Sequence, residues 1–162
     1  MAAKEKRHDK GYRTARENLD DLIDRDSFVE YGQLAVAAQK SRREIEELRT
    51  ETAADGIITG FGKINGDILQ DSKALSAIII NDYSVLAGTQ GYYHHKKLDR
   101  ICETAEKQNL PVIMYTEGGG GRPGDTDVHV QFAGLNIPSF SNWAKLRAVS
   151  YTHLTLPTNS GV

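Results

Sequence analysis

The sequence has a single cysteine, Cys102, among its 162 residues, so it can form neither an internal disulfide nor a cysteine-based zinc ribbon. It has no apolar run near the roughly 20 residues that a membrane-spanning helix needs. Its 20 Lys and Arg residues nearly balance its 22 Asp and Glu residues, so charge predicts no affinity for nucleic acid or for a membrane surface. These absences fit a cytoplasmic protein, and the length fits one domain.

The N-terminus is basic but contains no apolar core, so it is not a secretory signal. Two acidic residues, Glu5 and Asp9, argue against an organellar transit peptide. We therefore expect residues 1–13 to form a basic, solvated flank.

Two capping-box patterns, at residues 14–17 and 41–44, predict two helix starts. The first precedes a short amphipathic helix over Ala15–Ile23, and the second precedes a polar helix. Between them, Phe28–Leu34 has the composition of a strand.

The central sequence predicts a strand, helix and strand in succession. Gly56–Asp67 mixes short apolar runs with Gly and Asn, as a hairpin does. Ala74–Asp82 is a continuous apolar run, typical of a strand that is covered on both faces. An amphipathic helix over His94–Gln108 follows and ends at Asn109, and Val112–Thr116 is a second buried strand. This order is a βαβ unit, which is right-handed as a rule.

The C-terminal residues 148–162 show no continuity with the helical pattern before them. The eleven residues from Ala148 to Thr158 can be encoded by codons that contain the mosaic-end sequence of transposase-based sequencing adapters. We interpret residues 148–162 as an adapter-derived tail, exclude them from the fold, and give His153 no functional weight.

The segment TEGGGGRPGDTD, Thr116–Asp127, follows the second predicted strand and has four consecutive glycines. A flexible loop is one interpretation, and a cradle of backbone N–H groups for an oxyanion is the other. The spacing Gly119-x-Gly121-x-x-Gly124 matches a dinucleotide fingerprint, but no helix and no later acidic strand end accompany it. The Lys-Ser/Thr pair of a P-loop is absent too. An oxyanion or thioester ligand therefore fits better than a nucleotide.

No cluster in the sequence has the spacing of a metal site or of a catalytic dyad. His94 and His95 are adjacent, so their side chains would point about 100° apart on a helix, and we expect them to be exposed or capping. Cys102 is predicted to be a core thiol, and Asp125 and Asp127 turn formers. The cations Lys96, Lys97 and Arg100 form either a solvated face or a contact for an anionic ligand.

Three segments in order, Ala54–Gly66, Asp82–Val112 and Glu117–Asp127, resemble the carboxyltransferase component of biotin-dependent acyl-CoA carboxylases. The upstream segment Arg13–Leu34 resembles the entry segment of the same family, and the resemblance runs to about Arg147. The combination is specific, whereas the glycine loop by itself is not.

The resemblance implies a crotonase-like α/β fold, a spiral of ββα units, of which residues 14–147 would be an incomplete N-terminal portion. It also implies a reaction that moves a carboxylate from carboxybiotin, held on a partner carrier domain, to the α-carbon of an acyl-CoA. The partners would be biotin carboxylase and carrier components, with a homo-oligomeric parent. Backbone donors for a thioester enolate would explain the absence of a nucleophilic side chain.

The resemblance also assigns site residues. Gly119 and Gly120 match the paired glycines of the family's first glycine loop and are the predicted catalytic positions, and Arg122 matches its following arginine. Gly88, Gly91, Gly121 and Arg122 are predicted to lie along the acyl-CoA site, and Lys97 and Arg100 near the CoA phosphates. No metal ligands are expected.

The sequence departs from the family in ways that bear on activity. The family's second glycine-rich segment and its second crotonase-like half do not precede the adapter-like tail. We therefore expect this chain to be an N-terminal piece that is inactive alone. The alternatives are a non-catalytic acyl-CoA-binding or assembly module, a biotin-dependent decarboxylase subunit and, more remotely, a nicotinamide-binding enzyme.

Overall fold

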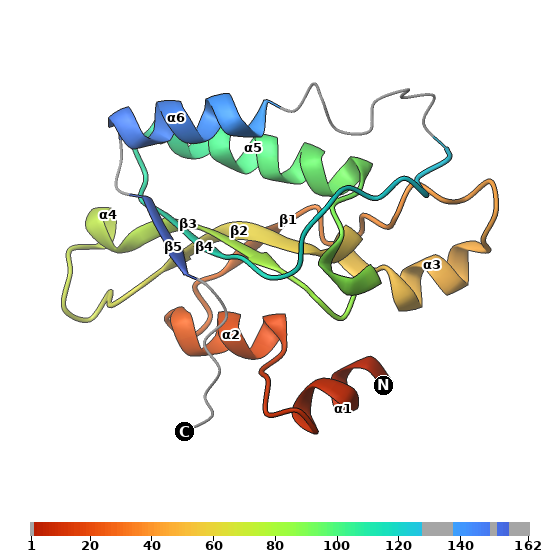
Figure 1. Ribbon diagram of the computed structural model, residues 1–162. Helices are drawn as coiled ribbons and strands as arrows, with labels where there is room; N and C mark the ends of the chain where they lie inside the picture. The colour runs from red at the N-terminus through yellow and green to blue at the C-terminus, as the bar shows by residue number, and fades with distance from the viewer. Residues whose placement is uncertain (1, 128–137, 150–151, 156–162) are drawn as a thin grey trace.

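The computed structural model describes residues 2–127, 138–149 and 152–155. A five-stranded sheet in the order β1-β2-β3-β4-β5 lies between helices on its two faces (Figure 1). The strands are β1 (Val29–Tyr31), β2 (Ile57–Lys63), β3 (Leu75–Asn81), β4 (Val112–Tyr115) and β5 (Thr152–Thr155). β1, β2 and β3 pair antiparallel, whereas β3, β4 and β5 pair parallel.

Strand β3 is the centre of the sheet and explains the continuous apolar run. Ile79 faces a cluster that includes Leu98, Ile101 and Cys102 of α5 (Tyr92–Gln108). The alternate residues Ile78 and Ile80 face the opposite cluster, formed with Leu19 of α2 (Ala15–Leu22). Because both faces are covered, the successive residues Ser76–Asn81 of the strand are all buried, as the sequence predicted.

The predicted βαβ unit is confirmed: β3, α5 and β4 follow in order, and the two strands are parallel. Helix α5 begins two residues before the predicted start and ends at Asn109, which adopts the left-handed conformation with φ 52°. α6 (Ser139–Val149) packs beside α5 on the same face of the sheet (Figure 1).

The first capping box is confirmed, because Thr14 and Glu17 make both of its reciprocal bonds at the start of α2. The second is wrong. α3 (Ile45–Glu51) begins after Glu44 with no side-chain cap. Ser41 instead donates its amide to Asp127 at 2.7 Å, a contact between distant loops that a local pattern does not reveal.

Two strand predictions need correction. β1 covers only Val29–Tyr31 of the predicted Phe28–Leu34. Gly56–Asp67 is not a hairpin by itself, because β2 runs straight through it and pairs with β3 after a connection that contains α4 (Asp71–Ala74). Gly60 and Gly62 therefore do not form a turn. They allow β2 to pack closely against β1 and the loop before it, because a Cβ atom at Gly60 would lie 2.4 Å from the Val29 carbonyl oxygen.

The ends of the chain also carry structure. Residues 2–8 form α1 (Ala2–His8), and Arg7 is an exception to the expected solvated flank because it is only 8% exposed. Thr152–Thr155 pairs with β4 as β5. The adapter interpretation of residues 148–162 concerns the encoding DNA and stays a prediction.

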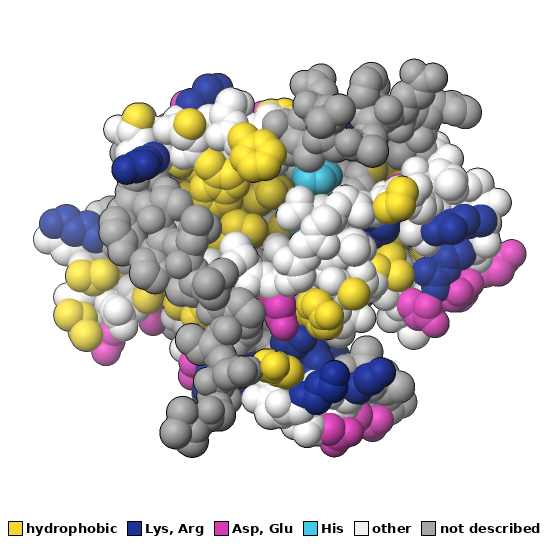
Figure 2. Space-filling view, viewed as in Figure 1, with side chains coloured by type: hydrophobic (Ala, Val, Ile, Leu, Met, Phe, Trp, Pro, Cys, Tyr) yellow, Lys and Arg dark blue, Asp and Glu magenta, His cyan; other side chains and the backbone are white. Residues whose placement is uncertain are grey.

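Charges of both signs lie side by side on the described surface that Figure 2 draws. Figure 2 shows basic and acidic side chains interspersed over the regions of α1 and α3. Exposed ion pairs such as Arg49–Glu46 in α3 account for part of this pattern. Among the described residues, no helix is both long and apolar enough to cross a membrane.

Candidate functional site

The glycine loop lies beside the loop that follows β3. Because β3 and β4 are parallel, the segments after their carboxyl ends meet at one edge of the sheet. There the Gln90 amide donates to the Gly120 carbonyl at 3.0 Å, and the Arg122 amide donates to the Gln90 carbonyl at 2.9 Å. The sequence-predicted glycines of both loops are thus brought together.

The start of the glycine loop is packed against the first loop. A Cβ atom at Gly118 would lie 2.7 Å from the Gly88 Cα, and one at Gly88 would lie 2.7 Å from the Glu117 carbonyl oxygen. Both glycines also have positive φ, 81° and 69°. Glycine is therefore required at both positions by backbone contact and by conformation.

The middle of the loop has the opposite surroundings. A Cβ atom at Gly119, Gly120 or Gly121 would meet no atom within 4 Å. Among the described residues, no acceptor takes a hydrogen bond from the amides of these three glycines. The loop therefore presents bare backbone donors to open space, the arrangement that an oxyanion-bearing ligand needs.

The amino end of α5 is closed by two carboxylates. Asp125 accepts from the Tyr92 amide at 2.8 Å, and Asp55 accepts from the His94 amide at 2.8 Å. Carboxylates are favourable at this position because the first amides of a helix lack partners within it. Asp125 therefore does more than form a turn, and the helix end is not open to an anionic ligand.

The buried Arg122 side chain lies between the Asp55 and Asp125 carboxylates and contacts both. Its guanidinium pairs with Asp55 and lies 3.6 Å from Asp125, and it donates to the Thr89 carbonyl at 2.7 Å. Burial raises the pKa of the Asp55 carboxyl, while the Arg122 charge and the hydrogen bond from the His94 amide oppose that rise. Arg122, predicted to bind substrate, here uses most of its donors within the protein.

The other glycine of the first loop makes room for this network. A Cβ atom at Gly91 would lie 2.4 Å from both Arg122 Nη1 and Asp125 Oδ2. Gly91 therefore lies against the Arg122 and Asp125 side chains, and its predicted place along the acyl-CoA site stays a prediction.

Lys97 points into the protein and not toward the glycine loops. Its ammonium donates to the carbonyls of Ala54, at 2.8 Å, and Ile57. Burial lowers the pKa of Lys97 to about 8. The carbonyls belong to a turn in which Ala54 and Asp55 have positive φ, 54° and 50°, so Lys97 supports the turn that presents Asp55.

The histidine and cysteine expectations have different outcomes. His94 is fully buried, which contradicts the expected exposure or capping, and burial lowers its pKa to about 3, so the ring is neutral. Cys102 is the predicted core thiol, with a pKa that burial raises to about 12. Arg100 is exposed on α5. Among the described residues no His, Cys, Asp and Glu group could hold a metal ion.

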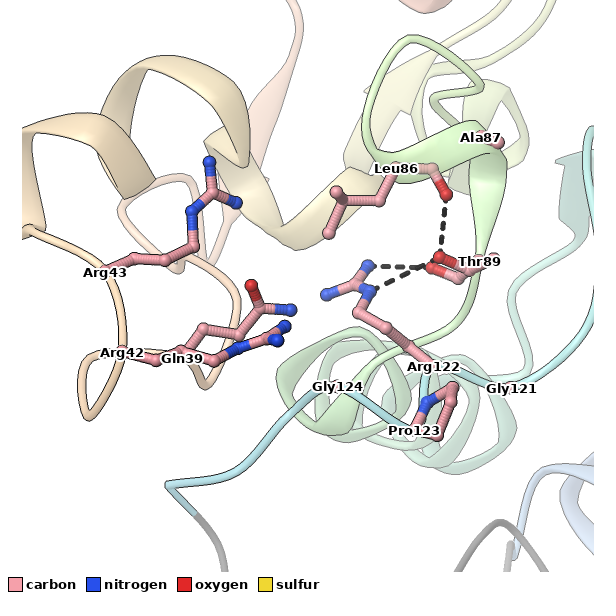
Figure 3. Close-up of a pocket in the computed structure, with 10 residues that line it drawn as sticks. All are labelled: Gln39, Arg42, Arg43, Leu86, Ala87, Thr89, Gly121, Arg122, Pro123 and Gly124. Carbon is pink, nitrogen blue, oxygen red and sulfur yellow. Dashed lines mark hydrogen bonds between the residues drawn. The ribbon is translucent and has the colours of Figure 1, made fainter.

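A cavity of about 660 Å³ opens beside Gly121, and its charged lining residues are three arginines (Figure 3). Arg122 is neutralised by Asp55, and Arg43 by Glu47 at 2.6 Å and by Glu51. Arg42 has no anionic partner among the described residues and is exposed. The other lining residues are Gln39, Leu86, Ala87, Thr89, Gly121, Pro123 and Gly124.

Sequence reasoning missed Arg42, because residues 41–44 looked like a helix cap. The side chain lies over the glycine loop: a Cβ atom at Gly124 would approach Arg42 Nη2 to 2.5 Å. Figure 3 shows the polar ends of Gln39, Arg42 and Arg122 turned toward the same space. A free arginine in a cavity without acidic lining residues is suited to an anionic group.

Comparison with curated proteins reveals similarity to acyl-CoA carboxylase subunits. The chain is 32% identical over 115 residues to a propionyl-CoA carboxylase beta chain of Roseobacter denitrificans, covering 71% of this chain and 21% of that protein. It is 35% identical over 120 residues to a biotin-dependent acetyl-/propionyl-coenzyme A carboxylase beta5 subunit of Mycobacterium tuberculosis, covering 74% and 20%. The chain thus spans about a fifth of these relatives.

Solved structures agree with this similarity. A single-chain, multi-domain long-chain acyl-CoA carboxylase matches with a TM-score of 0.88 and 47% identity, covering 96% of this chain and 15% of that one. The beta subunit of Pseudomonas aeruginosa geranyl-CoA carboxylase matches with a TM-score of 0.67 and 26% identity, covering 93% and 26%. The predicted crotonase-like α/β fold is confirmed. The family model described as the carboxyl transferase domain matches residues 6–136, and the chain belongs to that family.

Proposed function

We propose that this chain forms one wall of the acyl-CoA site in a biotin-dependent carboxyltransferase. The parent enzyme would move a carboxylate from carboxybiotin to the α-carbon of an acyl-CoA of the acetyl or propionyl type. The observation that carries the proposal is the row of backbone amides at Gly119, Gly120 and Gly121, which have no hydrogen-bond acceptor among the described residues.

These amides suit the chemistry of a thioester. Loss of an α-proton places negative charge on the thioester oxygen, which fixed N–H donors stabilise without a nucleophilic side chain. The space next to Gly119–Gly121 admits a ligand group, because no atom lies within 4 Å of the Cβ positions. Carboxybiotin on its carrier would supply the carboxyl group, and the biotin left after transfer would take up the α-proton. The residues of this chain bind and orient the acyl acceptor.

The anionic part of the substrate fits the neighbouring cavity. Coenzyme A carries a diphosphate and a further phosphate, and Arg42 offers an unpaired guanidinium within the lining. Lys97 and Arg100 were the residues predicted from sequence for this role. Because the Lys97 ammonium is committed to two carbonyls, Arg42 is the stronger candidate of the three.

The remaining parts of the reaction need other components. We propose biotin carboxylase and a biotin carrier as partners and a homo-oligomeric parent, in keeping with the named relatives. Because the chain spans about a fifth of those relatives, we expect it to be inactive alone. Mixed with biotin carboxylase and carrier, the purified chain should not carboxylate acetyl-CoA, and turnover would overturn this part of the proposal.

Calorimetric titration tests the binding proposal. The wild-type chain is titrated with acetyl-CoA and with an unacylated series of CoA, 3′-dephospho-CoA and pantetheine. We expect affinity to fall with each phosphate removed, and Arg42→Met to weaken acetyl-CoA binding about tenfold, the value of one charge-assisted contact. The control is Arg25→Met, because Arg25 is 96% exposed in its side chain and lies outside the cavity.

The two parts of the proposal can fail separately. If the wild type binds acetyl-CoA and Arg42→Met binds it equally well, the phosphates lie elsewhere. If the wild type binds neither acetyl-CoA nor CoA, the acyl-CoA site itself is contradicted for this chain.

A decarboxylase is a second candidate, because the chain is 31% identical over 119 residues to a methylmalonyl-CoA decarboxylase alpha subunit of Veillonella parvula. Such an enzyme uses the same acyl-CoA site in the reverse direction. If this candidate is correct, the parent protein, assayed with methylmalonyl-CoA and free biotin, would form propionyl-CoA and carboxybiotin without ATP, and the carboxybiotin would then release CO2. Carboxylation of propionyl-CoA that depends on ATP and biotin carboxylase would favour the first.

A further inference from the structure

Arg7, from the N-terminal segment that the sequence predicted to be solvated, makes a paired contact with the glycine loop. Its guanidinium forms two parallel contacts with the Glu117 carboxylate, at 2.7 and 2.9 Å, across 110 residues of sequence. The two side chains are only 9% and 15% exposed. Such a two-pronged, partly buried ion pair is directional and is screened less than a surface pair.

Glu117 is the residue from which the glycine loop begins. Its backbone carbonyl accepts from Asn81 Nδ2 at 3.4 Å and lies against Gly88. The side chain is held by Arg7 and the main chain by the end of β3, so Glu117 is fixed from two sides. The open amides of Gly119–Gly121 begin two residues later.

Arg7 is itself held in place on the protein. It donates to the Arg13 carbonyl at 3.0 and 2.7 Å, and its guanidinium lies over the rings of Tyr12 and Tyr83 at 5.6 and 5.7 Å. Tyr83 belongs to the loop after β3, which also contains Gly88. Arg7 thus contacts both loops that meet at the site.

We propose that Arg7 is a positioning residue: it fixes Glu117, and through Glu117 it sets the direction in which the Gly119–Gly121 amides point. The effect on acyl-CoA rests on the proposed function, whereas the effect on the loop does not. A pair that only stabilised the fold would have no need to be located at the first residue of the ligand-facing loop.

The test separates positioning from stability with a double variant. Arg7→Met leaves the Glu117 carboxylate partly buried and unpaired, so both stability and loop order should fall. Arg7→Met/Glu117→Gln removes both charges, so the thermal midpoint should recover toward wild type. The loop has still lost its tether and should remain disordered in the double variant.

Amide hydrogen exchange of Gln90 and Arg122, followed by NMR, reports the loop directly, because these amides join the two loops. We expect at least about tenfold faster exchange in Arg7→Met and in the double variant, relative to amides of β3. Acetyl-CoA affinity should fall in both. The control is the double variant Arg13→Met/Asp21→Asn, which removes an ion pair of the same region whose side chains are 55% and 66% exposed. It should change neither the exchange rates nor the acetyl-CoA affinity.

The outcomes decide the proposal. If the double variant recovers both the thermal midpoint and slow exchange, the pair is purely structural and the proposal is wrong. If Arg7→Met does not fold, the double variant alone decides. If no variant of the chain binds acetyl-CoA but exchange rises as expected, the positioning role stands and the proposed function fails.

Discussion

Gly118 and Gly119 are neighbours in the chain, yet they have opposite surroundings. Gly118 lies against the backbone of Gly88 and has a φ of 81°. Gly119 has no atom within 4 Å of its Cβ position. The first glycine is explained by packing, whereas the second is explained only by something that is to approach the loop.

The comparison extends to the residues on either side. Glu117 before the open glycines is held by Arg7, and Arg122 after them is held by Asp55. Two buried or partly buried ion pairs thus fix the ends of a short stretch whose middle leaves open space at the Cβ positions of Gly119, Gly120 and Gly121. Rigid ends and an exposed middle are what a preorganised set of backbone donors requires.

The largest effect is expected at the fixed end after the open glycines. Arg122→Met leaves the fully buried Asp55 carboxylate without its charge partner, which should lower the free energy of unfolding by about 3–5 kcal/mol in urea titrations. Arg43→Met is the control, because its partners Glu47 and Glu51 are 46% and 59% exposed and it should cost under about 1 kcal/mol. Equal losses of unfolding free energy in both variants would contradict the distinction between a buried and an exposed ion pair.

The next largest effect is expected at the packed glycine. Gly118→Ala places a methyl group 2.7 Å from the Gly88 Cα at a residue of positive φ, so the free energy of unfolding should fall by about 3 kcal/mol. Chemical denaturation measures this loss. A change below about 1 kcal/mol would show that the two loops separate easily, and it would contradict the claim that packing against Gly88 requires a glycine at residue 118.

A pH dependence tests whether the first turn of α5 is sealed. His94 has a pKa lowered to about 3, so the folded state keeps the ring neutral, while the unfolded chain takes up a proton below about pH 6.5. Its contribution to stability is therefore complete above pH 6.5 and is lost as the pH falls toward 3. The loss from this group should approach about 1.4 kcal/mol per pH unit.

The measurement is the free energy of unfolding between pH 6.5 and 5. His94→Gln should have a shallower slope than the wild type in this range. The control is His8→Gln, because His8 is exposed. The slope of His8→Gln should exceed that of His94→Gln by as much as the wild-type slope does. Equal slopes in the wild type and His94→Gln would mean that water reaches His94.

The smallest effect on stability is expected in the open half. Gly119→Ala should change the free energy of unfolding by less than about 0.5 kcal/mol, because its methyl group meets no atom. Gly120→Ala should cost about 1 kcal/mol from its φ of 84° alone. Both should weaken acetyl-CoA binding in calorimetric titrations, since the methyl groups occupy the ligand's side of the loop. Undiminished affinity would argue that the ligand does not approach there.

Periodic and continuous patterns in the sequence predicted the centre of the fold. The run Ala74–Asp82, the amphipathic helix after it and the glycine loop each follow from local residue order. The same reasoning gave a wrong hairpin at Gly56–Asp67, because the partner of β2 lies beyond a long connection. Antiparallel pairing between distant segments leaves no local signal.

Sequence reasoning singled out the glycine run as a candidate site but did not separate its parts. It assigned Gly118 and Gly119 to one glycine run, although only a three-dimensional contact with Gly88 distinguishes them. Arg7 and Lys97 looked like solvated or ligand-facing cations, yet both are buried against partners 40 or more residues away. The direction of a long cationic side chain depends on distant acceptors, which a local pattern does not contain.

Titration of the labelled chain with acetyl-CoA, followed at the amide resonances of Gly118 to Gly121, tests the central claim most directly. We expect shifts at Gly119, Gly120 and Gly121 that saturate with ligand, because these amides become hydrogen-bond donors to it. Gly118, packed against Gly88, should shift least. Binding that perturbs resonances elsewhere and leaves the three open glycines unchanged would contradict the account.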